Sequence, residues 1–253
     1  HQTASARVKA DPATVEVLRK RLDFQYPYQR AAQIPSKLTA TELKGRYADY
    51  EAAEDAETTD SAKKRRLTGL RPRFITKRTA LTPTERGTAL HLAMQFIDYS
   101  KCGNIDGIRD ELLRLEEKCF ISAQQAAAIE PEKILEFFTS PLGQRVLRAD
   151  KLYREFKFSL LVPAGEFFND AGEAADDEIL FQGVVDCCFQ ENGALHVIDF
   201  KSDYVTRETL KEKTRLYAPQ LNAYSRAMER IIGLPVNSRI IYFFTLGESA
   251  ETL

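Results

Sequence analysis

Residues 179–201 read Ile-Leu-Phe-Gln-Gly-Val-Val-Asp-Cys-Cys-Phe-Gln-Glu, then Asn-Gly, then Ala-Leu-His-Val-Ile-Asp-Phe-Lys. Asn-Gly between two runs rich in β-branched and aromatic residues predicts a β-hairpin, because a type I′ turn needs positive φ at both central positions. With Asn192 and Gly193 as the turn, Glu191 pairs with Ala194. Counting back along both strands then places Asp186 directly opposite Asp199, with Cβ atoms roughly 5 Å apart.

This predicted pair of aspartates indicates a cation site. Like charges directly opposite each other in an apolar sheet are destabilising unless a positive charge lies between them. Lys201 is two residues after Asp199, so it projects from the same face of the strand. Two carboxylates and a lysine converging on one point favour a divalent cation, and hard oxygen ligands favour Mg²⁺ or Mn²⁺. Such a site suits hydrolysis of a phosphodiester bond, with Lys201 orienting water or neutralising charge on phosphorus.

An alternative interpretation is a surface ion cluster on an exposed sheet face, where aspartate and lysine are common. The apolar neighbours of the two aspartates argue against it: Val184, Val185, Val197 and Ile198. The prediction depends on an unshifted register, because a β-bulge would move Asp186 away from Asp199.

The composition is that of an ordinary globular domain. The 253 residues are 43% hydrophobic and 29% charged, with a net charge of -1, which argues against a generally basic nucleic-acid coat. No apolar run is long enough to span a bilayer and no secretion signal opens the chain, so we expect no membrane association and a cytoplasmic location. The four cysteines lack metal-binding spacing, so we expect reduced thiols, with neither zinc nor an iron–sulfur cluster.

The first 34 residues differ in character from the rest. The chain opens on His1, which we interpret as a piece of a longer protein. We expect residues 1–34 to be a lead-in or linker with a short helix at Ala13–Leu22, and residues 35–253 to form the functional domain. No phosphate-binding loop motif occurs, so we do not expect this chain to hydrolyse ATP.

Helical patterns precede strand patterns in the remaining chain. Thr82-Pro-Thr-Glu85 has the spacing of a capping box with proline at the first helical position, and Thr39 and Glu42 have the same spacing. The fold class is therefore α/β, a small central mixed sheet flanked by helices, in one domain with an N-terminal helical layer. The expected helices are Ser122–Ile129, Pro131–Phe138, Pro141–Ala149 and about Glu208–Ile232; the further strands are Leu152–Val162 and Ser238–Thr245; the expected loops are Asp49–Asp60 with the basic cluster Lys63–Arg66, and Gly165–Glu178.

Several other residues are candidates for the site. His91 lies beside the apolar face of a predicted helix, and an imidazole tolerates Mn²⁺, although a packed or surface histidine is the alternative. Gln220 and Tyr224 stand four apart on one helix face and could hold a phosphate or steer Lys201, or be ordinary polar positions. Glu155 is a candidate supporting residue or remote ligand. A further set gives the same helix a positive bias suited to a DNA backbone: Lys211, Lys213, Arg215, Arg226 and Arg230.

Read in order, six short motifs resemble the PD-(D/E)xK nucleases, and within them the RecB-type nuclease domains of AddA-type helicase–nuclease proteins. They run over about residues 35–253, and their order carries the resemblance although none is specific alone. The motifs are Pro35-Ser-Lys-Leu-Thr-Ala-Thr-Glu-Leu-Lys44, Arg86-Gly-Thr-Ala-Leu-His91, Arg154-Glu-Phe-Lys-Phe158, Gly183-Val-Val-Asp186, Val197-Ile-Asp-Phe-Lys-Ser-Asp203 and Gln220-Leu-Asn-Ala-Tyr224.

The resemblance implies a restriction-endonuclease-like core and assigns a role to each matched residue. His91, Asp186, Asp199 and the carbonyl of Phe200 become metal ligands, Lys201 the catalytic lysine, and Gln220 with Tyr224 a supporting pair. It implies a Mg²⁺-dependent deoxyribonuclease, of exonuclease type, that cuts single-stranded DNA from double-strand breaks for recombinational repair. The implied partners are DNA ends, a helicase region upstream in the same chain and an AddB-like subunit. The cysteines that AddB-type relatives use for an iron–sulfur cluster are absent.

Two other interpretations stay open at this stage. The first is another nuclease of the same fold, such as a stand-alone or Cas4-like exonuclease. The second is a DNA-binding or docking module whose metal site is structural, which would bind DNA without cutting it.

Overall fold

A computed structural model describes residues 11–43 and 81–252. The chain forms two compact units. Of the described residues, one unit contains those up to Ser36 together with Leu161–Ile179, and the larger unit contains those within Lys37–Leu160 and Leu180–Leu253. Residues 161–179 belong to the smaller unit, although they come from within the range that the prediction assigned to the functional domain. The predicted acidic loop and the basic cluster Lys63–Arg66 lie outside the described residues.

The smaller unit is built from short elements. Helix α1 (Pro12–Leu22) matches the predicted helix, and the side chain of Asp11 accepts a hydrogen bond from Thr14 N at 3.2 Å to cap it. Helix α2 (Gln29–Gln33) packs against the 3₁₀ turn η3 (Gly172–Ala174). That turn and η2 (Ala164–Glu166) interrupt the segment that we expected to be a loop.

A mixed sheet forms the centre of the larger unit, as predicted. Its strand order is β1-β3-β4-β5-β6, with β2 paired to β3 outside that path. The β1–β3 and β4–β5 pairs are parallel, and the β3–β4 and β5–β6 pairs are antiparallel. The strands are β1 (Lys37–Thr39), β2 (Lys151–Pro163), β3 (Glu178–Glu191), β4 (Ala194–Lys201), β5 (Val236–Phe243) and β6 (Glu248–Glu251).

The β3–β4 hairpin has the predicted turn and the predicted register. Asn192 and Gly193 have φ values of 53° and 77°, as a type I′ turn requires. The paired residues run without a shift from Glu191 and Ala194 to Cys187 and Ile198. The paired residues end there, and Asp186 and Asp199 are the next residues toward the open end of the hairpin.

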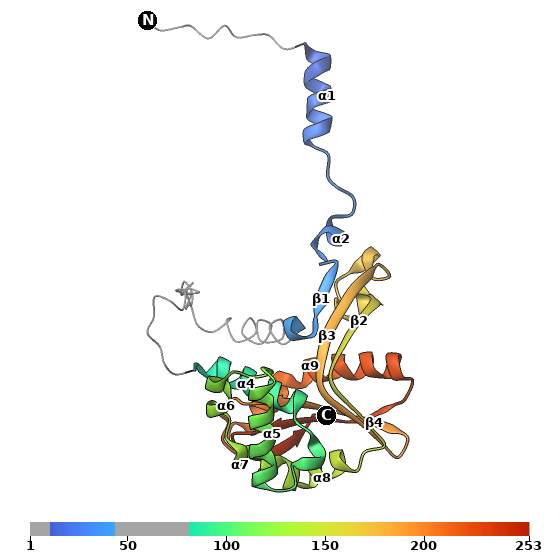
Figure 1. Cartoon of the computed structure of the whole chain (residues 1–253). Coiled ribbons are helices and arrows are strands. Elements are labelled where there is room, and N and C mark those ends of the chain that lie inside the picture. Colours follow the sequence, from blue (N-terminus) through green and yellow to red (C-terminus); the bar gives the residue numbers. More distant parts are fainter. Residues whose placement is uncertain (1–10, 44–80, 253) are drawn as a thin grey trace, which may run out of the picture. The chain divides into compact units, whose positions relative to one another are not determined.

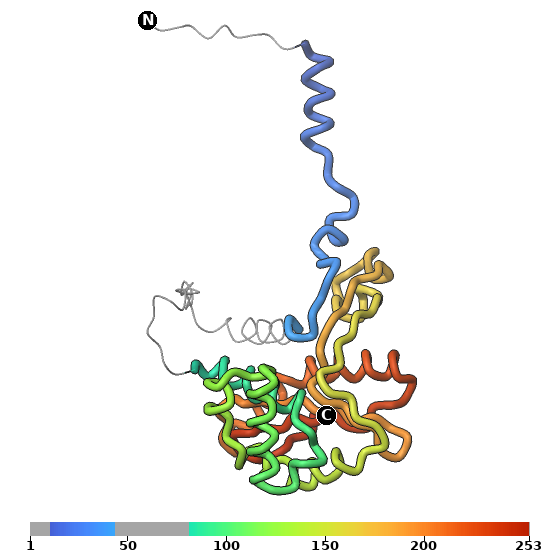
Figure 2. Tube along the Cα trace, viewed as in Figure 1, coloured from blue at the N-terminus to red at the C-terminus, as the bar shows by residue number. Residues whose placement is uncertain are grey.

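Helices precede the long strands in the chain, and Figure 2 shows this order as green segments followed by yellow and orange ones. Most lie where the sequence predicts them, whereas α5 and the 3₁₀ turn η1 were not predicted. The described helices of this part are α4 (Pro83–Phe96), η1 (Tyr99–Lys101), α5 (Ile105–Glu117), α6 (Ala123–Ala128), α7 (Pro131–Thr139), α8 (Pro141–Leu147) and α9 (Leu210–Ile232). None of the helices that the structure describes is long and apolar enough to cross a membrane.

The sheet is covered on both faces, because β5 alternates between two apolar clusters. Ile240 and Tyr242 belong to the cluster with α4, α5, α7 and α8. Ile241 and Phe243 belong to the other cluster, with Tyr217 and Leu221 of α9. Alternate residues of a strand point to opposite faces, so one strand serves two helical layers (Figure 1). This arrangement buries β4 and holds the open end of the hairpin between α4 and α9.

Candidate active site

Helix α4 brings His91 to the sheet. The helix begins with the predicted capping box, in which Thr82 N donates to the Glu85 carboxylate at 2.8 Å and Glu85 N donates to Thr82 Oγ1 at 3.3 Å. Gly87 then lies so close to the segment after β4 that a Cβ there would be 2.6 Å from Ser202 Oγ. The absence of a side chain at Gly87 therefore lets α4 approach the end of β4, one turn before His91.

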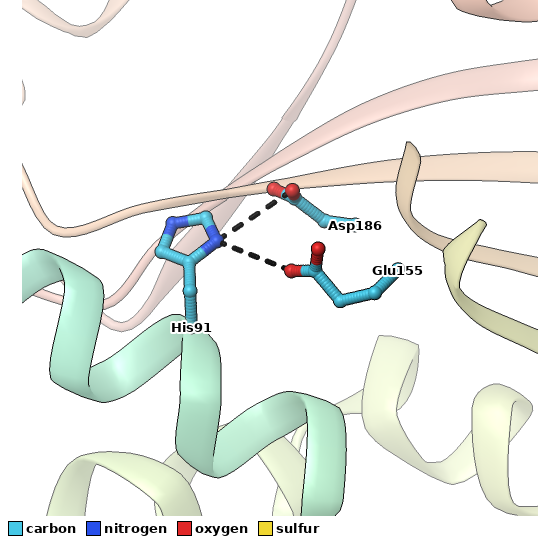
Figure 3. Close-up of side chains that lie close together, drawn as sticks. All are labelled: His91, Glu155 and Asp186. Carbon is cyan, nitrogen blue, oxygen red and sulfur yellow. Dashed lines mark ion pairs between the residues drawn. The ribbon is translucent and has the colours of Figure 1, made fainter. Parts of the chain in front are cut away.

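His91, Glu155 and Asp186 form a group that could hold a metal ion, with one possible ligand atom from each lying within 4.8 Å of the others. Nδ1 of His91 is 3.5 Å from Asp186 Oδ1 and 3.9 Å from Glu155 Oε1. Figure 3 shows the imidazole pointing from α4 toward both carboxylates. The three side chains come from α4, β2 and β3, so the group exists only in the folded protein.

Glu155 reaches this group through an unusual backbone conformation. Its φ is 46°, a region that costs a non-glycine residue about 1–2 kcal/mol. In a regular strand Arg154 and Glu155 would point to opposite faces. Here the Arg154 guanidinium donates to the carbonyl of Ile97 at the end of α4, at 2.6 Å, while Glu155 approaches His91. The positive φ at residue 155 thus lets two consecutive side chains of β2 contact α4.

Lys201 and Asp199 form a close ion pair beside the group. Asp199 is 1% exposed, and its Oδ2 lies 2.5 Å from Lys201 Nζ. Apart from this ion pair, the described part of the chain offers that buried oxygen no hydrogen-bond donor. Asp186 is oriented separately, since its Oδ2 accepts a hydrogen bond from Phe200 N at 2.8 Å. The two aspartates thus end the hairpin with different partners.

The pKa directions follow from crowding of charge under low solvent exposure. Burial acts to lower the pKa of His91, but the interaction with Asp186 outweighs it, so the pKa of the imidazole is raised. Burial raises the pKa of Asp199, with Lys201 opposing and Asp186 adding to the rise. Burial, followed by the charge of Asp186, also raises the pKa of Glu155. Three carboxylates brought together in this way favour binding a positive charge.

Gln220 and Tyr224 form a buried pair on α9. Gln220 Nε2 donates to Tyr224 Oη at 2.7 Å, and burial raises the pKa of the phenol. Gly183 of β3 makes room for this ring, because a Cβ there would lie 2.6 Å from the ring of Phe158 and 3.1 Å from that of Tyr224. The glycine of the Gly183-Val-Val-Asp186 motif therefore lets α9 pack close to the strand that carries Asp186.

Two hollows open onto these residues. The first has a volume of about 880 Å³ and is lined by His91, Glu155, Asp186 and Lys201, among others. The second, of about 630 Å³, is lined by Asp199 and Tyr224 and shares His91, Asp186, Lys201 and Gln220 with the first. The candidate residues thus lie in the wall between two hollows.

The sequence matches the family model of the PD-(D/E)XK nuclease superfamily over residues 61–251. The chain belongs to this superfamily. The matched range contains the whole candidate site, from His91 of α4 to Tyr224 of α9. The mixed sheet with helices on both faces agrees with the fold expected for its members.

Among curated proteins, the chain is similar to proteins named as the A subunit of an ATP-dependent helicase/nuclease. It is 37% identical to that of Clostridium acetobutylicum over 243 residues, and 40% identical to that of Desulforamulus reducens over 238 residues; each match covers 94% of this chain and 19% of the relative. The protein from Clostridium botulinum is 34% identical over 233 residues, which cover 91% of this chain and 18% of the relative. The chain thus spans about a fifth of the length of these relatives.

The residues present fit the divalent metal ion that nucleases of this superfamily use. Asp199 has a buried carboxylate oxygen whose described partner is one ammonium, and one imidazole and two carboxylates converge nearby. An imidazole with carboxylate oxygens is a donor set for Mn²⁺ and, through the oxygens, for Mg²⁺. His91, Glu155 and Asp186 would hold such an ion, and Asp199 lies alongside them with Lys201.

The structure thus arranges the expected residues differently from the ligand set that the resemblance implies. Glu155, expected as a supporting residue or remote ligand, lies in the convergent group, while Asp199 lies outside it and pairs with Lys201. Phe200 contributes its N–H to Asp186 and lines the first hollow. Among the basic residues of α9, Lys213 lines that hollow, whereas Lys211, Arg215, Arg226 and Arg230 are exposed.

Sequence reasoning missed the contact of Tyr217 with Lys201 and the contact of Asp203 with Tyr217. The ring centroid of Tyr217 lies 4.6 Å from Lys201 Nζ, and the Tyr217 hydroxyl donates to the carboxylate of Asp203. Tyr217 is three residues before Gln220 on α9, so helical spacing puts both on one side of the helix. This spacing was the available signal for Tyr217, because Tyr217, Gln220 and Tyr224 lie at i, i+3 and i+7 on one face of α9.

Proposed function

We propose that this chain is the nuclease domain of an ATP-dependent helicase–nuclease and hydrolyses phosphodiester bonds of single-stranded DNA with the help of a divalent metal ion. One observation carries the proposal. The group of His91, Glu155 and Asp186 lines one hollow of about 880 Å³ together with Lys201, so a phosphate there could reach the ligand group and the ammonium at once.

Each residue has a proposed role in this chemistry. A cation held by His91, Glu155 and Asp186 would polarise the phosphoryl group and lower the pKa of a water molecule. Lys201 orients that water and neutralises charge that develops on the phosphate oxygens, a stabilisation that is larger in a partly buried site. Asp199 fixes the Lys201 ammonium, and Phe200 N–H fixes the Asp186 carboxylate. Gln220 and Tyr224, hydrogen-bonded to each other on α9, support the strand that carries Asp186.

The ion that we propose is Mg²⁺, with Mn²⁺ as an effective substitute. Oxygen ligands suit both ions, while the imidazole of His91 favours Mn²⁺ relative to Mg²⁺. We therefore expect cleavage with either ion.

The wider context of the proposal comes from the resemblance to AddA-type helicase–nuclease proteins. We propose that the chain works as an exonuclease on the 3′-terminated strand at DNA ends, next to a helicase region of the same protein and an AddB-like subunit. The whole assembly would resect double-strand breaks for recombinational repair in the bacterial cytoplasm. ATP hydrolysis would belong to the helicase region, because this chain has no phosphate-binding loop motif.

The first test is cleavage of end-labelled single-stranded DNA by the purified chain, with and without Mg²⁺ or Mn²⁺. Wild type should cut only with the ion, and Lys201→Ala should not cut while still binding the DNA. Lys118→Ala is the matched control, because Lys118 is an exposed lysine at the end of α5 that lines neither hollow. Comparing 5′ and 3′ labels would give the polarity.

Two outcomes would count against the proposal. Cleavage by Lys201→Ala at the wild-type rate would remove the role of that residue. DNA binding without cutting by the wild type, with either ion, would instead support a binding or docking module whose metal ion is structural.

A further inference from the structure

A third hollow adjoins the candidate site. It has a volume of about 520 Å³ and lies against the start of α4 and the segment after β4. Pro83, Ser202 and Tyr204 line both this hollow and the first one. The segment at residues 202–204 thus forms a boundary between the hollow that holds the candidate catalytic residues and the hollow that lacks them.

Tyr204 is unusual on this boundary because its large side chain is 83% exposed. Within residues 11–43 and 81–252 its ring stacks on no other ring and its hydroxyl has no hydrogen-bond partner. Its two neighbours are held firmly. Asp203 accepts hydrogen bonds from Tyr217 and, through its carbonyl, from Thr245 Oγ1 at 2.5 Å, and Val205 is 4% exposed. A fixed backbone therefore presents a free aromatic face three residues after Lys201.

Positive charge lies in both hollows around Tyr204. Lys213 lines the first hollow, and Arg86 and Lys133 line the third. Lys133 is paired with Glu136 at 3.2 Å, whereas in the described parts of the chain no carboxylate pairs with Arg86 or Lys213. Lys213 and Arg86, which have no carboxylate partner among the described residues, thus line the hollows on the two sides of the exposed Tyr204 ring. Positive charge on both sides of an aromatic ring matches the alternation of phosphates and bases in a nucleic-acid strand.

We infer that Tyr204 is a stacking platform for one base of the strand, next to the nucleotide whose phosphate reaches Lys201, and that the strand continues into the third hollow toward Arg86. This inference rests on the proposed nuclease function. A base inside a duplex already stacks on its neighbours, so the Tyr204 ring accepts a base from a single strand. Stacking on one ring is tolerant of sequence, as every base has an aromatic face. Tyr204 thus positions the strand and selects single-stranded DNA.

Binding to the Lys201→Ala protein tests the inference without cutting. The probe is a fluorescein-labelled 12-mer of thymidylate, followed by anisotropy, and the second probe is the same 12-mer built from abasic residues. Tyr204→Ala should weaken binding of the thymidylate by about tenfold and leave the abasic strand unchanged. Tyr204→Phe should bind both like the parent, because it retains the ring. Leu113→Ala is the control, as Leu113 is 56% exposed and lines none of the three hollows.

Arg86→Gln tests the path of the strand separately. A lost phosphate contact should weaken both probes equally and reduce the slope of log affinity against log salt by about one. Equal binding of thymidylate by Tyr204→Ala and its parent would overturn the role of Tyr204, as would an equal loss on the abasic strand. If wild type cuts and Lys201→Ala does not, that result leaves the proposed function standing. If the Lys201→Ala protein binds neither probe and the wild type does not cut, both the role of Tyr204 and the proposed nuclease function would be overturned.

Discussion

The ammonium of Lys201 is held by two neighbours, and both bear on the proposed role of Lys201. Asp199 contacts it at 2.5 Å, and the ring of Tyr217 lies 4.6 Å away. The ring face of a tyrosine attracts a cation by about 0.5–2 kcal/mol, more when the pair is desolvated. Tyr217 is 2% exposed and is fixed at its hydroxyl by Asp203. We therefore propose that Tyr217 positions Lys201.

Substitution at Tyr217 should change the rate of the chemical step. We expect Tyr217→Leu to lower the single-turnover cleavage rate by about tenfold, because the ring no longer attracts the ammonium. Tyr217→Phe keeps the ring and should restore most of the rate, and neither change should alter DNA affinity. Tyr242→Leu is the control, since Tyr242 is equally buried but belongs to the cluster on the other face of the sheet. A Leu variant with the wild-type rate would exclude this role.

Single residues of the site were predictable to different degrees. Asp186, Asp199 and Lys201 followed from the turn chemistry of Asn192-Gly193 and from strand periodicity, and the observed pairs from Glu191–Ala194 to Cys187–Ile198 have the register on which that prediction depends. The sequence left Glu155 between a supporting residue and a remote ligand, because its φ of 46° breaks the alternation on which strand reasoning depends. Nor did the contact of Tyr217 with Lys201, which depends on how α9 rotates against the sheet.

At the scale of elements, buried Glu111 ties α5 to the turn before it. Its carboxylate accepts hydrogen bonds from Arg114 on the same helix, from Asp98 N at 2.9 Å and from Lys101 Nζ at 3.0 Å. The bonds from Arg114, and then those from Asp98 and Lys101, lower the pKa of this carboxyl to about 2, against the opposing effect of burial. Glu111 thereby fixes η1 and the end of α4 to α5.

The contribution of Glu111 to stability should depend on pH. Its folded pKa lies below the ordinary 4.5, so its stabilisation is present above pH 4.5 and is lost as pH falls toward about 2. Glu111→Gln should therefore lower the free energy of unfolding by roughly 2–3 kcal/mol at pH 7 and by less at pH 3.5. Thermal unfolding at both pH values measures the difference. Glu117→Gln, an exposed change on the same helix, is the control; a pH-independent loss at Glu111 would contradict the assignment.

Elements with local signals were predictable. The capping box of α4, the hairpin turn and the proline starts of α7 and α8 each lie where the sequence places them. Strands β1 and β6 were missed because they span Lys37–Thr39 and Glu248–Glu251, too few residues for a periodic pattern. Helix α5 has an Asn104 cap that bonds Gly107 N at 2.8 Å and an apolar face at Ile108, Leu112 and Leu115, so a signal for it was present.

At the scale of the whole molecule, metal binding should be coupled to folding. An ion that binds the folded chain but not the unfolded chain raises the free energy of unfolding by about 2.7 kcal/mol when its free concentration is a hundred times its Kd. We expect Mg²⁺ or Mn²⁺ to raise Tm by roughly 5–10 °C at that concentration, since the ligands converge only after folding. Asp186→Asn should abolish the rise, and exposed Asp106→Asn should preserve it. Differential scanning fluorimetry measures both, and an unchanged wild-type Tm would contradict the predicted ion site.

The mixed α/β architecture was predictable because helix and strand patterns separate along the chain. The association of residues 161–179 with α2 was not, since a polar segment carries no signal for the part of the chain that it contacts. Short-range chemistry thus predicts elements better than it predicts which distant segments meet.

The origin of His91, Glu155 and Asp186 in three separate elements has a consequence for local opening. A cation shared by these three residues would act as a removable cross-link between α4, β2 and β3, which are far apart in the chain. With the cross-link in place, α4 could not separate from the sheet while β2 and β3 stayed paired, because that motion would break the coordination. Amide hydrogens in α4 would then exchange with solvent at rates approaching those of the hairpin, and the fluctuations of the three elements would become a single cooperative event.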